Sequence, residues 1–159
     1  MDIAYVRGIY SVPMNTKYIK RAVLILALTA TPSLASTTST VAMTLWGEAR
    51  DQSFDGKHAV ASVIWNRANG KASKLSAVCL DRKQFSCWQR GAFSQKMPNM
   101  KNPIDRKAWS ECVVLAGQMV NRSFLPSMKS KHYHEASIRP YWSVNMRLLA
   151  SVGSHKFYK

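Results

Sequence analysis

Three stretches of the chain repeat apolar residues at helical spacing, and each predicts a helix. The first covers about residues 41–50, and its inward face carries Val41, Thr44, Leu45 and Glu48. The second lies between Asp55 as N-cap and Gly70 as stop, with an apolar face of Ala59, Val60, Val63 and Ile64. The third and clearest covers about residues 104–121, with a broad apolar face of Ala108, Trp109, Cys112, Val113, Ala116, Met119 and Val120.

The rest of the chain predicts shorter elements. Residues 75–80 favour a short helix, and residues 84–88 alternate polar and aromatic side chains in a loop or short extended segment. Residues 152–158 favour a short terminal strand or extended tail. With 159 residues, of which 47% are hydrophobic, the chain suits one small globular domain. We therefore predict a mostly α fold, α+β with little strand.

The first 35 residues have the organisation of a signal peptide. Lys17, Lys20 and Arg21 precede a short apolar run at 22–30, and small residues at 33–35 suit cleavage after Ala35. Translation from Met14 would leave the same arrangement. The apolar run is shorter than the ~20 residues of a membrane span, although a retained anchor stays the alternative. We expect export to the periplasm or cell wall, a short linker at 36–40 and a catalytic domain at 41–159.

The chain is strongly basic, with 23 Lys and Arg against 8 Asp and Glu. Removing residues 1–35 takes away four cations and one carboxylate, so the mature chain keeps a net charge of +12. Such a surface attracts polyanions: nucleic acid, acidic lipids or an anionic cell wall. Export disfavours nucleic acid. The cysteines are odd in number (Cys79, Cys87 and Cys112), so at least one is free or pairs with another chain.

Glu48 ends the apolar face of the first predicted helix. A carboxyl group beside apolar walls loses solvation, which favours the protonated form that a general acid needs near neutral pH. The chain has only three glutamates, Glu48, Glu111 and Glu135. A glutamate at a helix end that turns out to water is the alternative, and the pattern alone leaves both interpretations open.

Other candidate residues lie in the less regular segments. Gln84 and Ser86 can hydrogen-bond a sugar, and aromatic residues such as Phe85 can stack on a pyranose ring, although ordinary loop and core roles fit equally well. His132 and His134 form an H-x-H pair that suggests a metal site. No third ligand at suitable spacing is evident unless Glu135 or His155 folds in, so we predict no metal and no cofactor.

Six short motifs occur in one order along residues 42–158: Gly47-Glu48-Ala49-Arg50; Gly56 with Ala59-Val60-Ala61-Ser62-Val63 and Asn66-Arg67; Gln84-Phe85-Ser86; His132-Tyr133-His134; Tyr141-Trp142; and Gly153-x-His155-x-Phe157-Tyr158. Together they resemble the cell-wall hydrolase family typified by spore-cortex-lytic enzymes. The resemblance implies a small, mostly α-helical, lysozyme-like fold that acts on peptidoglycan, with Glu48 as the catalytic acid/base. The expected role is wall remodelling or phage-type lysis.

A conventional glycosidase needs a second carboxylate across the bond, but Asp51 and Asp55 lie in a polar break and the other acids are scattered. The resemblance favours a lytic transglycosylase, in which Glu48 alone serves as acid and base and a 1,6-anhydro product forms. Hydrolysis with an Asp helper is the alternative. The residues expected to bind substrate are Gln84, Phe85, Ser86, Tyr133, His134, Tyr141 and Trp142.

The expected partner is peptidoglycan, not nucleic acid, and we expect a monomer that touches the membrane transiently through the signal segment only. Two further hypotheses stay open. One is a metal-dependent wall amidase or peptidase that uses His132 and His134. The other is a non-enzymatic basic protein that binds the wall or nucleic acid.

Overall fold

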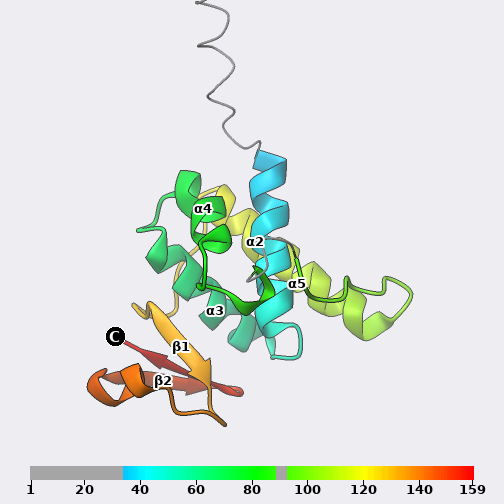
Figure 1. Cartoon of the computed structure of the whole chain (residues 1–159). Coiled ribbons are helices and arrows are strands. Elements are labelled where there is room, and N and C mark those ends of the chain that lie inside the picture. The colour runs from blue at the N-terminus through cyan, green and yellow to red at the C-terminus, as the bar shows by residue number, and fades with distance from the viewer. Residues whose placement is uncertain (1–33, 89–92) are drawn as a thin grey trace, which may run out of the picture. The chain divides into compact units, whose positions relative to one another are not determined.

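The structure is a computed structural model that describes residues 34–88 and 93–159. Helices come first and a small sheet follows (Figure 1). The helices are α2 (Leu34–Ala49), α3 (Phe54–Arg67), α4 (Leu75–Leu80) and α5 (Pro103–Val120), and the strands are β1 (His132–Glu135), β2 (Leu148–Val152) and β3 (His155–Tyr158). The 3-10 turns are η1 (Ala72–Lys74), η2 (Ser86–Trp88) and η3 (Tyr141–Asn145). This confirms the predicted small, mostly α-helical domain with little strand.

Helix α2 begins earlier than the apolar pattern predicts. Residues 36–40 belong to the helix, so the prediction of a linker there is wrong. The hydroxyl of Thr40 donates to the carbonyl of Ser36 at 2.9 Å, and Thr44 donates to the carbonyl of Thr40 at 2.8 Å. These bonds satisfy the hydroxyl groups within the helix, so a polar run can continue it. The predicted signal peptide falls almost wholly on residues 1–33, outside the described part of the chain.

Helix α3 has a different cap from the expected one. Ser53, not Asp55, is the N-cap, because its hydroxyl accepts a hydrogen bond from the Gly56 N–H at 3.2 Å. Asp55 lies in the first turn, where a negative charge interacts favourably with the helix dipole. The helix ends at Arg67, slightly before Gly70, which has a φ of +69° and donates its N–H to the Trp65 carbonyl.

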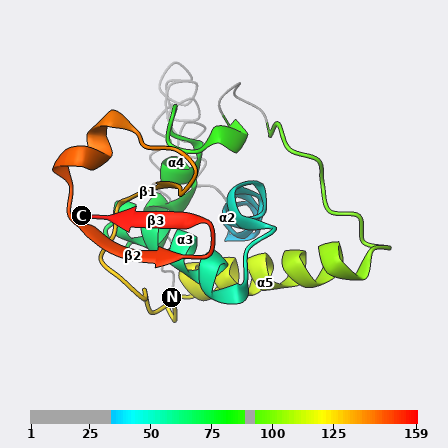
Figure 2. The ribbon, with the colours of Figure 1, turned by 90° about the horizontal axis from the view of Figure 1, so that it is seen from below.

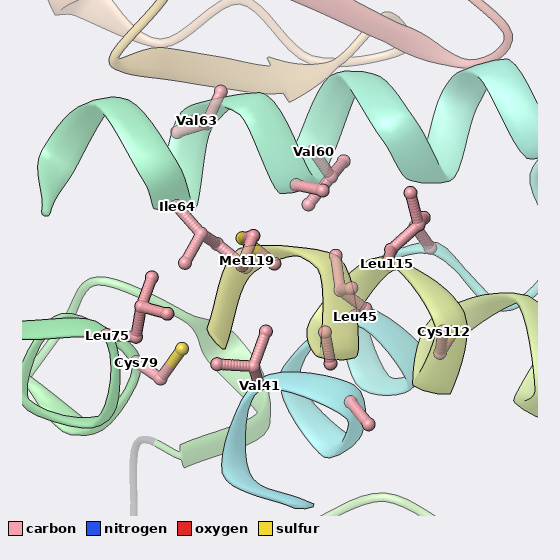
Figure 3. Packing of buried hydrophobic residues seen from close by; sticks show 14 of the residues in the cluster. Val41, Leu45, Val60, Val63, Ile64, Leu75, Cys79, Cys112, Leu115 and Met119 are labelled. Atoms are coloured by element: carbon pink, nitrogen blue, oxygen red, sulfur yellow. The ribbon is translucent and has the colours of Figure 1, made fainter. Parts of the chain in front are cut away.

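The inward faces of the four helices meet in one apolar core (Figure 3). Its largest fully buried aliphatic and sulfur side chains come from every helix: Val41, Leu45, Val60, Val63, Ile64, Leu75, Cys79, Leu115 and Met119. Burying a Val, Leu, Ile or Met side chain contributes about 1.5–3 kcal/mol, so this core dominates the stability of the domain. Helix α5 departs from its predicted face in one respect: Leu115 is buried whereas Val113 is exposed.

The sheet is antiparallel, with β3 between β1 and β2 (Figure 2). Strand β3 confirms the strand expected near the C-terminus, whereas β1 and β2 were not predicted. Tyr133 pairs with Phe157, and His134 pairs with Lys156. Because side chains alternate along a strand, Tyr133 and Phe157 lie on the face that joins the core, and His134 and Lys156 lie on the other.

Candidate active site

Glu48 lies at the penultimate position of α2, and both of its carboxylate oxygens accept hydrogen bonds. Oε1 accepts from the Ser86 hydroxyl at 2.9 Å and from the Cys87 backbone N–H at 3.2 Å, and Oε2 accepts from the Tyr133 hydroxyl at 2.8 Å. The donors come from η2 and β1, which are far from Glu48 in the sequence. A carboxylate at the negative end of a helix dipole is unfavourable by itself, and these three donors offset that effect.

Gly47 allows η2 to approach this end of α2 closely. A Cβ atom at position 47 would lie 2.6 Å from the Cβ of Cys87 and 3.0 Å from its sulfur, which is too close for any side chain. Without one, the Cys87 N–H reaches the neighbouring Glu48. The Gly-Glu pair therefore has a physical reason: the glycine makes room for the segment that binds the carboxylate.

Tyr133 is held in place by aromatic contacts. Its ring stacks on Phe157 at a centroid distance of 5.7 Å and meets the edge of His155 at 5.2 Å. Burial raises the pKa of Tyr133 well above its ordinary value, and the charge of Glu48 and the hydrogen bond to it raise this pKa further. The hydroxyl therefore stays protonated and remains a donor to Glu48 at any physiological pH.

A pocket of about 250 Å³ opens beside Glu48. Its lining comes from the end of α2, the following loop, the segment after η2 and the β1 and β3 ends of the sheet: Gly47, Glu48, Arg50, Asp51, Gln52, Gln95, Glu135, Ser154 and His155. Three of the eight acidic residues of this basic chain line it, namely Glu48, Asp51 and Glu135. The expectation that the acids other than Asp51 and Asp55 are scattered is wrong for Glu135, which the fold brings to the same pocket as Glu48 and Asp51.

His155 is a further titratable residue of this pocket. It is buried, and its Nδ1 has no hydrogen-bond partner among the described residues. Burial lowers the pKa of His155, although Asp51, Glu48 and Glu135 each act to raise it. The imidazole is therefore kept neutral at pH 7, because a charged ring needs an acceptor for both N–H groups.

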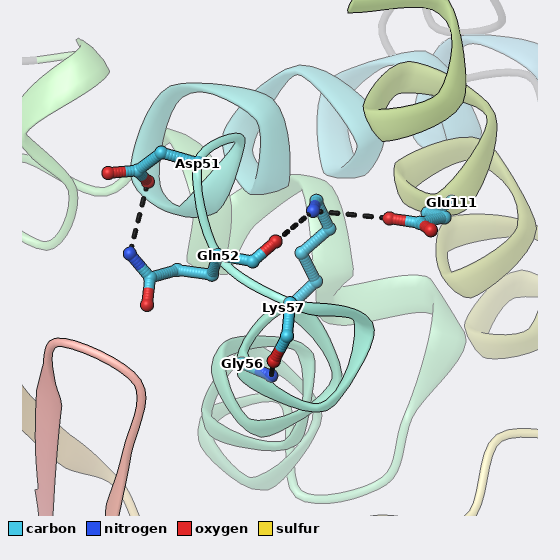
Figure 4. Close-up of polar contacts among 6 residues, drawn as sticks. Asp51, Gln52, Gly56, Lys57 and Glu111 are labelled. Atoms are coloured by element: carbon cyan, nitrogen blue, oxygen red, sulfur yellow. Dashed lines mark hydrogen bonds and ion pairs between the residues drawn. The ribbon is translucent and has the colours of Figure 1, made fainter. Parts of the chain in front are cut away.

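The loop after α2 is fixed by the side chain of Gln52. Its Nε2 donates to the Asp51 carboxylate at 3.1 Å and to the Ser154 hydroxyl at 2.9 Å, and its Oε1 accepts from the Ser154 N–H at 3.0 Å. Figure 4 shows the other side of this loop, where the buried Lys57 bonds the Gln52 carbonyl and pairs with Glu111 at 3.1 Å. The wall of the pocket is thus tied to α3, α5 and the β2–β3 turn.

The structure brings three of the eight predicted site residues together: Glu48, Ser86 and Tyr133. Phe85 is 1% exposed and packs in the core under the guanidinium of Arg67, 5.1 Å from its ring centroid. Gln84 is exposed, and its backbone carbonyl accepts from Arg67. Tyr141 is 88% exposed, on a turn that does not line the pocket.

His134 and Trp142 lie on the opposite face of the sheet from Tyr133. Their rings contact each other at 5.6 Å, and both pack on Tyr158. Each ring nitrogen of His134 has a partner, the Glu135 carbonyl at 2.7 Å and the Tyr158 hydroxyl at 2.9 Å. Within residues 34–88 and 93–159, no three His, Cys, Asp or Glu side chains are grouped as a metal would need. Both rings of the H-x-H pair pack against Trp142, His132 at 5.7 Å and His134 at 5.6 Å between ring centroids.

Arg67 and Asn66 support the site from the end of α3. The Arg67 Nε donates to the Lys131 carbonyl at 2.8 Å, next to β1. Asn66 donates to the carbonyls of Met128 and Ser130 at 2.7 and 2.9 Å. Both thus hold the segment that leads into β1. In the sequence, Asn66 and Arg67 were noted only as members of a motif. The signal that could have marked them as support for the site is their position, as two polar residues at the end of an apolar helix.

Comparisons with known proteins agree with this architecture. Residues 51–158 match the family described as Cell Wall Hydrolase, which is more than half of the chain, so the chain belongs to that family. Glu48 lies just before the matched residues. No curated protein matches the chain in sequence.

Two solved structures share the fold. The catalytic domain of the Bacillus cereus SleB protein is 22% identical, with a TM-score of 0.53 over 77% of this chain and 89% of that one. The catalytic domain of the germination-specific lytic transglycosylase SleB from Bacillus anthracis is 21% identical, with a TM-score of 0.55 over 77% of this chain and 93% of that one.

Proposed function

Because the chain belongs to the cell wall hydrolase family, we propose that it cleaves the glycan strand of peptidoglycan, with Glu48 as the catalytic acid and base. The observation that carries the proposal is the binding of Glu48 by Ser86, Cys87 and Tyr133 beside an open pocket. The bond that is cleaved joins N-acetylmuramic acid to N-acetylglucosamine. One structural relative, SleB from Bacillus anthracis, is a lytic transglycosylase, which is the reaction class proposed for this chain.

The proposed reaction needs one carboxyl group. Protonated Glu48 gives its proton to the oxygen that leaves from C1 of N-acetylmuramic acid. The resulting carboxylate then takes the proton of the C6 hydroxyl as that oxygen attacks C1. A 1,6-anhydro ring forms, no water is consumed, and Glu48 is protonated again. The three donors stabilise the carboxylate between the two steps, since hydrogen bonds to a charged acceptor are the strong ones.

Hydrolysis is the second candidate, and a specific observation favours it. Asp51 and Glu135 line the same pocket as Glu48, so a second carboxylate is available to activate a water. Under the single-carboxylate mechanism, Asp51→Asn and Glu135→Gln retain substantial activity. Under hydrolysis, one of them reduces turnover as severely as Glu48→Gln does.

The test is digestion of purified murein followed by mass spectrometry of the products. Anhydro-muropeptides support the transglycosylase, and products with reducing ends support the hydrolase. Intact glycan with cut peptides would instead indicate an amidase. Glu48→Gln keeps the shape of the side chain but cannot donate an acid proton, so the proposal expects its turnover to be lost; lysis at the wild-type rate would refute it.

We further propose that the protein works outside the inner membrane, because its substrate lies there. The proposal rests on the signal peptide predicted for residues 1–35. Cleavage after Ala35 would leave Ser36 in the first turn of α2, with the buried part of that helix intact. The mass of the protein recovered from the periplasm or medium tests this: an uncleaved N-terminus on a cytoplasmic product would contradict it.

A further inference from the structure

A second pocket, of about 490 Å³, lies on the face of the sheet opposite Tyr133. We call it the outer pocket. It is formed by β-strand residues and the connection that contains η3: His134, Ala136, Ser137, Ile138, Arg139, Ser143, Val144, Met146, Leu148, Lys156 and Tyr158. In Figures 1 and 2 the connection lies beyond the sheet, on the side away from α2 and α5. The outer pocket shares no lining residue with the pocket beside Glu48.

The outer pocket is lined by two cations, Arg139 and Lys156, and by no acid. Residues 136–159 contain Arg139, Arg147, Lys156 and Lys159 and no Asp or Glu. Glu135, the nearest acid in sequence, lines the pocket beside Glu48 instead. In the described part of the chain, the side chains of Arg139 and Lys156 take part in no ion pair, so no described carboxylate neutralises either charge.

The rim of the outer pocket is apolar and exposed. Ile138 is 55% exposed, Val144 60% and Leu148 49%, and Tyr141 projects from the same connection. Scattered apolar residues are normal on a protein surface, but here three of them line the same pocket as Arg139 and Lys156. Interfacial membrane binding uses this combination: cations that meet lipid phosphates, and apolar or aromatic side chains that enter the headgroup region.

We propose that the outer pocket and its rim form a docking surface for a bilayer that contains anionic phospholipid. A lipid phosphate lies between Arg139 and Lys156, while Ile138, Val144 and Tyr141 enter the interface. Charge complementarity carries the choice of occupant, because the surface offers cations and apolar side chains but no carboxylate. This contact adds to the one expected from the signal segment, and it does not depend on the reaction at Glu48.

The test uses co-sedimentation with vesicles of phosphatidylcholine, with or without one third phosphatidylglycerol. Each cation near an anionic surface strengthens binding roughly fivefold, so Arg139→Gln with Lys156→Gln should weaken binding to the anionic vesicles about 25-fold. The matched control is Lys101→Gln with Lys107→Gln, which removes the same charge from an exposed region at α5. All the proteins that are compared carry the same N-terminus, which mass spectrometry verifies.

A second pair of variants tests the apolar rim. Ile138→Ser with Val144→Ser should weaken vesicle binding, whereas Ile104→Ser with Leu125→Ser, at positions 77% and 81% exposed, should not. The midpoint of urea unfolding and the rate of murein cleavage serve as controls for folding, since none of these residues lines the pocket beside Glu48.

Several outcomes would overturn the proposal. If the Arg139/Lys156 and Lys101/Lys107 double variants lost vesicle binding equally, diffuse positive charge alone would account for the binding. Equal binding to neutral and anionic vesicles would remove the role of the cations. Displacement by soluble glycerol phosphate would indicate a small-anion site, and a loss of binding to murein sacculi in place of vesicles would assign the surface to the wall.

Discussion

Gly153 and Gly117 allow the same substitution to be tested with opposite expected signs. Gly153 lies in the β2–β3 turn with a φ of +57°, and a Cβ atom there would lie 2.3 Å from Oε1 of Gln52. Gly117 lies within α5, where a Cβ atom would meet nothing within 4 Å. We predict that Gly153→Ala destabilises the protein and that Gly117→Ala stabilises it.

The magnitude for Gly153→Ala follows from two effects. A left-handed backbone costs a residue with a Cβ about 1–2 kcal/mol. The added methyl group also displaces the Gln52 amide and breaks its two hydrogen bonds with Ser154, worth about 1 kcal/mol each. The lower entropy of the unfolded chain returns about 0.4–1 kcal/mol. The net loss is about 2–3.5 kcal/mol, whereas Gly117→Ala should gain about 0.5–1 kcal/mol from helix propensity.

The assay is urea unfolding followed by circular dichroism, with the midpoint and slope compared among variants. Gln52→Ala supplies the decisive background, because it removes the atom that the new methyl group would meet. In that background the cost of Gly153→Ala should fall by about 2 kcal/mol, to the backbone cost less the entropy return. If Gly153→Ala lies within about 0.5 kcal/mol of the wild type, or if its cost is unchanged without the Gln52 side chain, the reasoning fails.

Three further predictions concern the site, the ion pair and the thiols. Tyr133→Phe removes a donor to a charged oxygen, worth about 1.5–3 kcal/mol, so murein turnover should fall about 10- to 100-fold, while the exposed Tyr141→Phe should leave it unchanged. Glu111→Gln leaves the buried Lys57 without its counter-charge and should lower the free energy of unfolding by about 3–5 kcal/mol in urea titrations; no loss would mean that the ion pair is dispensable. Burial raises the pKa of Cys79 and Cys112 from 9.0 to about 12, so native thiols should resist iodoacetamide at pH 8 and react once unfolded. Because the unfolded thiols ionise first, stability should fall as pH rises from 9.0 towards 12. The loss should be smaller when both residues are replaced by Ala, but not absent, because burial also raises the pKa of Cys87 and of Tyr133.

The apolar spacing along the chain determined the helices and most of the core. Residues such as Leu45, Val60 and Met119 are buried as their spacing predicts, because helical periodicity is a local property that the order of residues carries directly. The start of α2 was missed for the same reason: residues 36–40 carry hydroxyl groups with no apolar period. Their helical state depends on hydrogen bonds within the helix and on contact with Ser76 of α4.

The sequence also singled out Glu48, Ser86 and Tyr133 as members of one site: helical periodicity pointed to Glu48, and the motifs pointed to all three. It placed His134, Trp142 and Phe85 beside them as well, and the structure places those residues elsewhere. The alternation of β1 explains the difference for His134, since Tyr133 and His134 are neighbours in sequence but point to opposite faces of the sheet.

Only the tertiary structure decided how the site is assembled. Tyr133, whose hydroxyl donates to Glu48, is 85 residues away from it along the chain, and Cys87, whose N–H donates to Glu48, is 39 residues away. Asp51 and Glu135 join the same pocket, and Gln52 reaches the β2–β3 turn. Hydrophobic spacing specifies which side of a helix turns inward, but it contains no information on which distant donor will meet a given carboxylate. That depends on how closely the packed elements approach, as at Gly47, where the absence of one Cβ atom brings η2 to the end of α2.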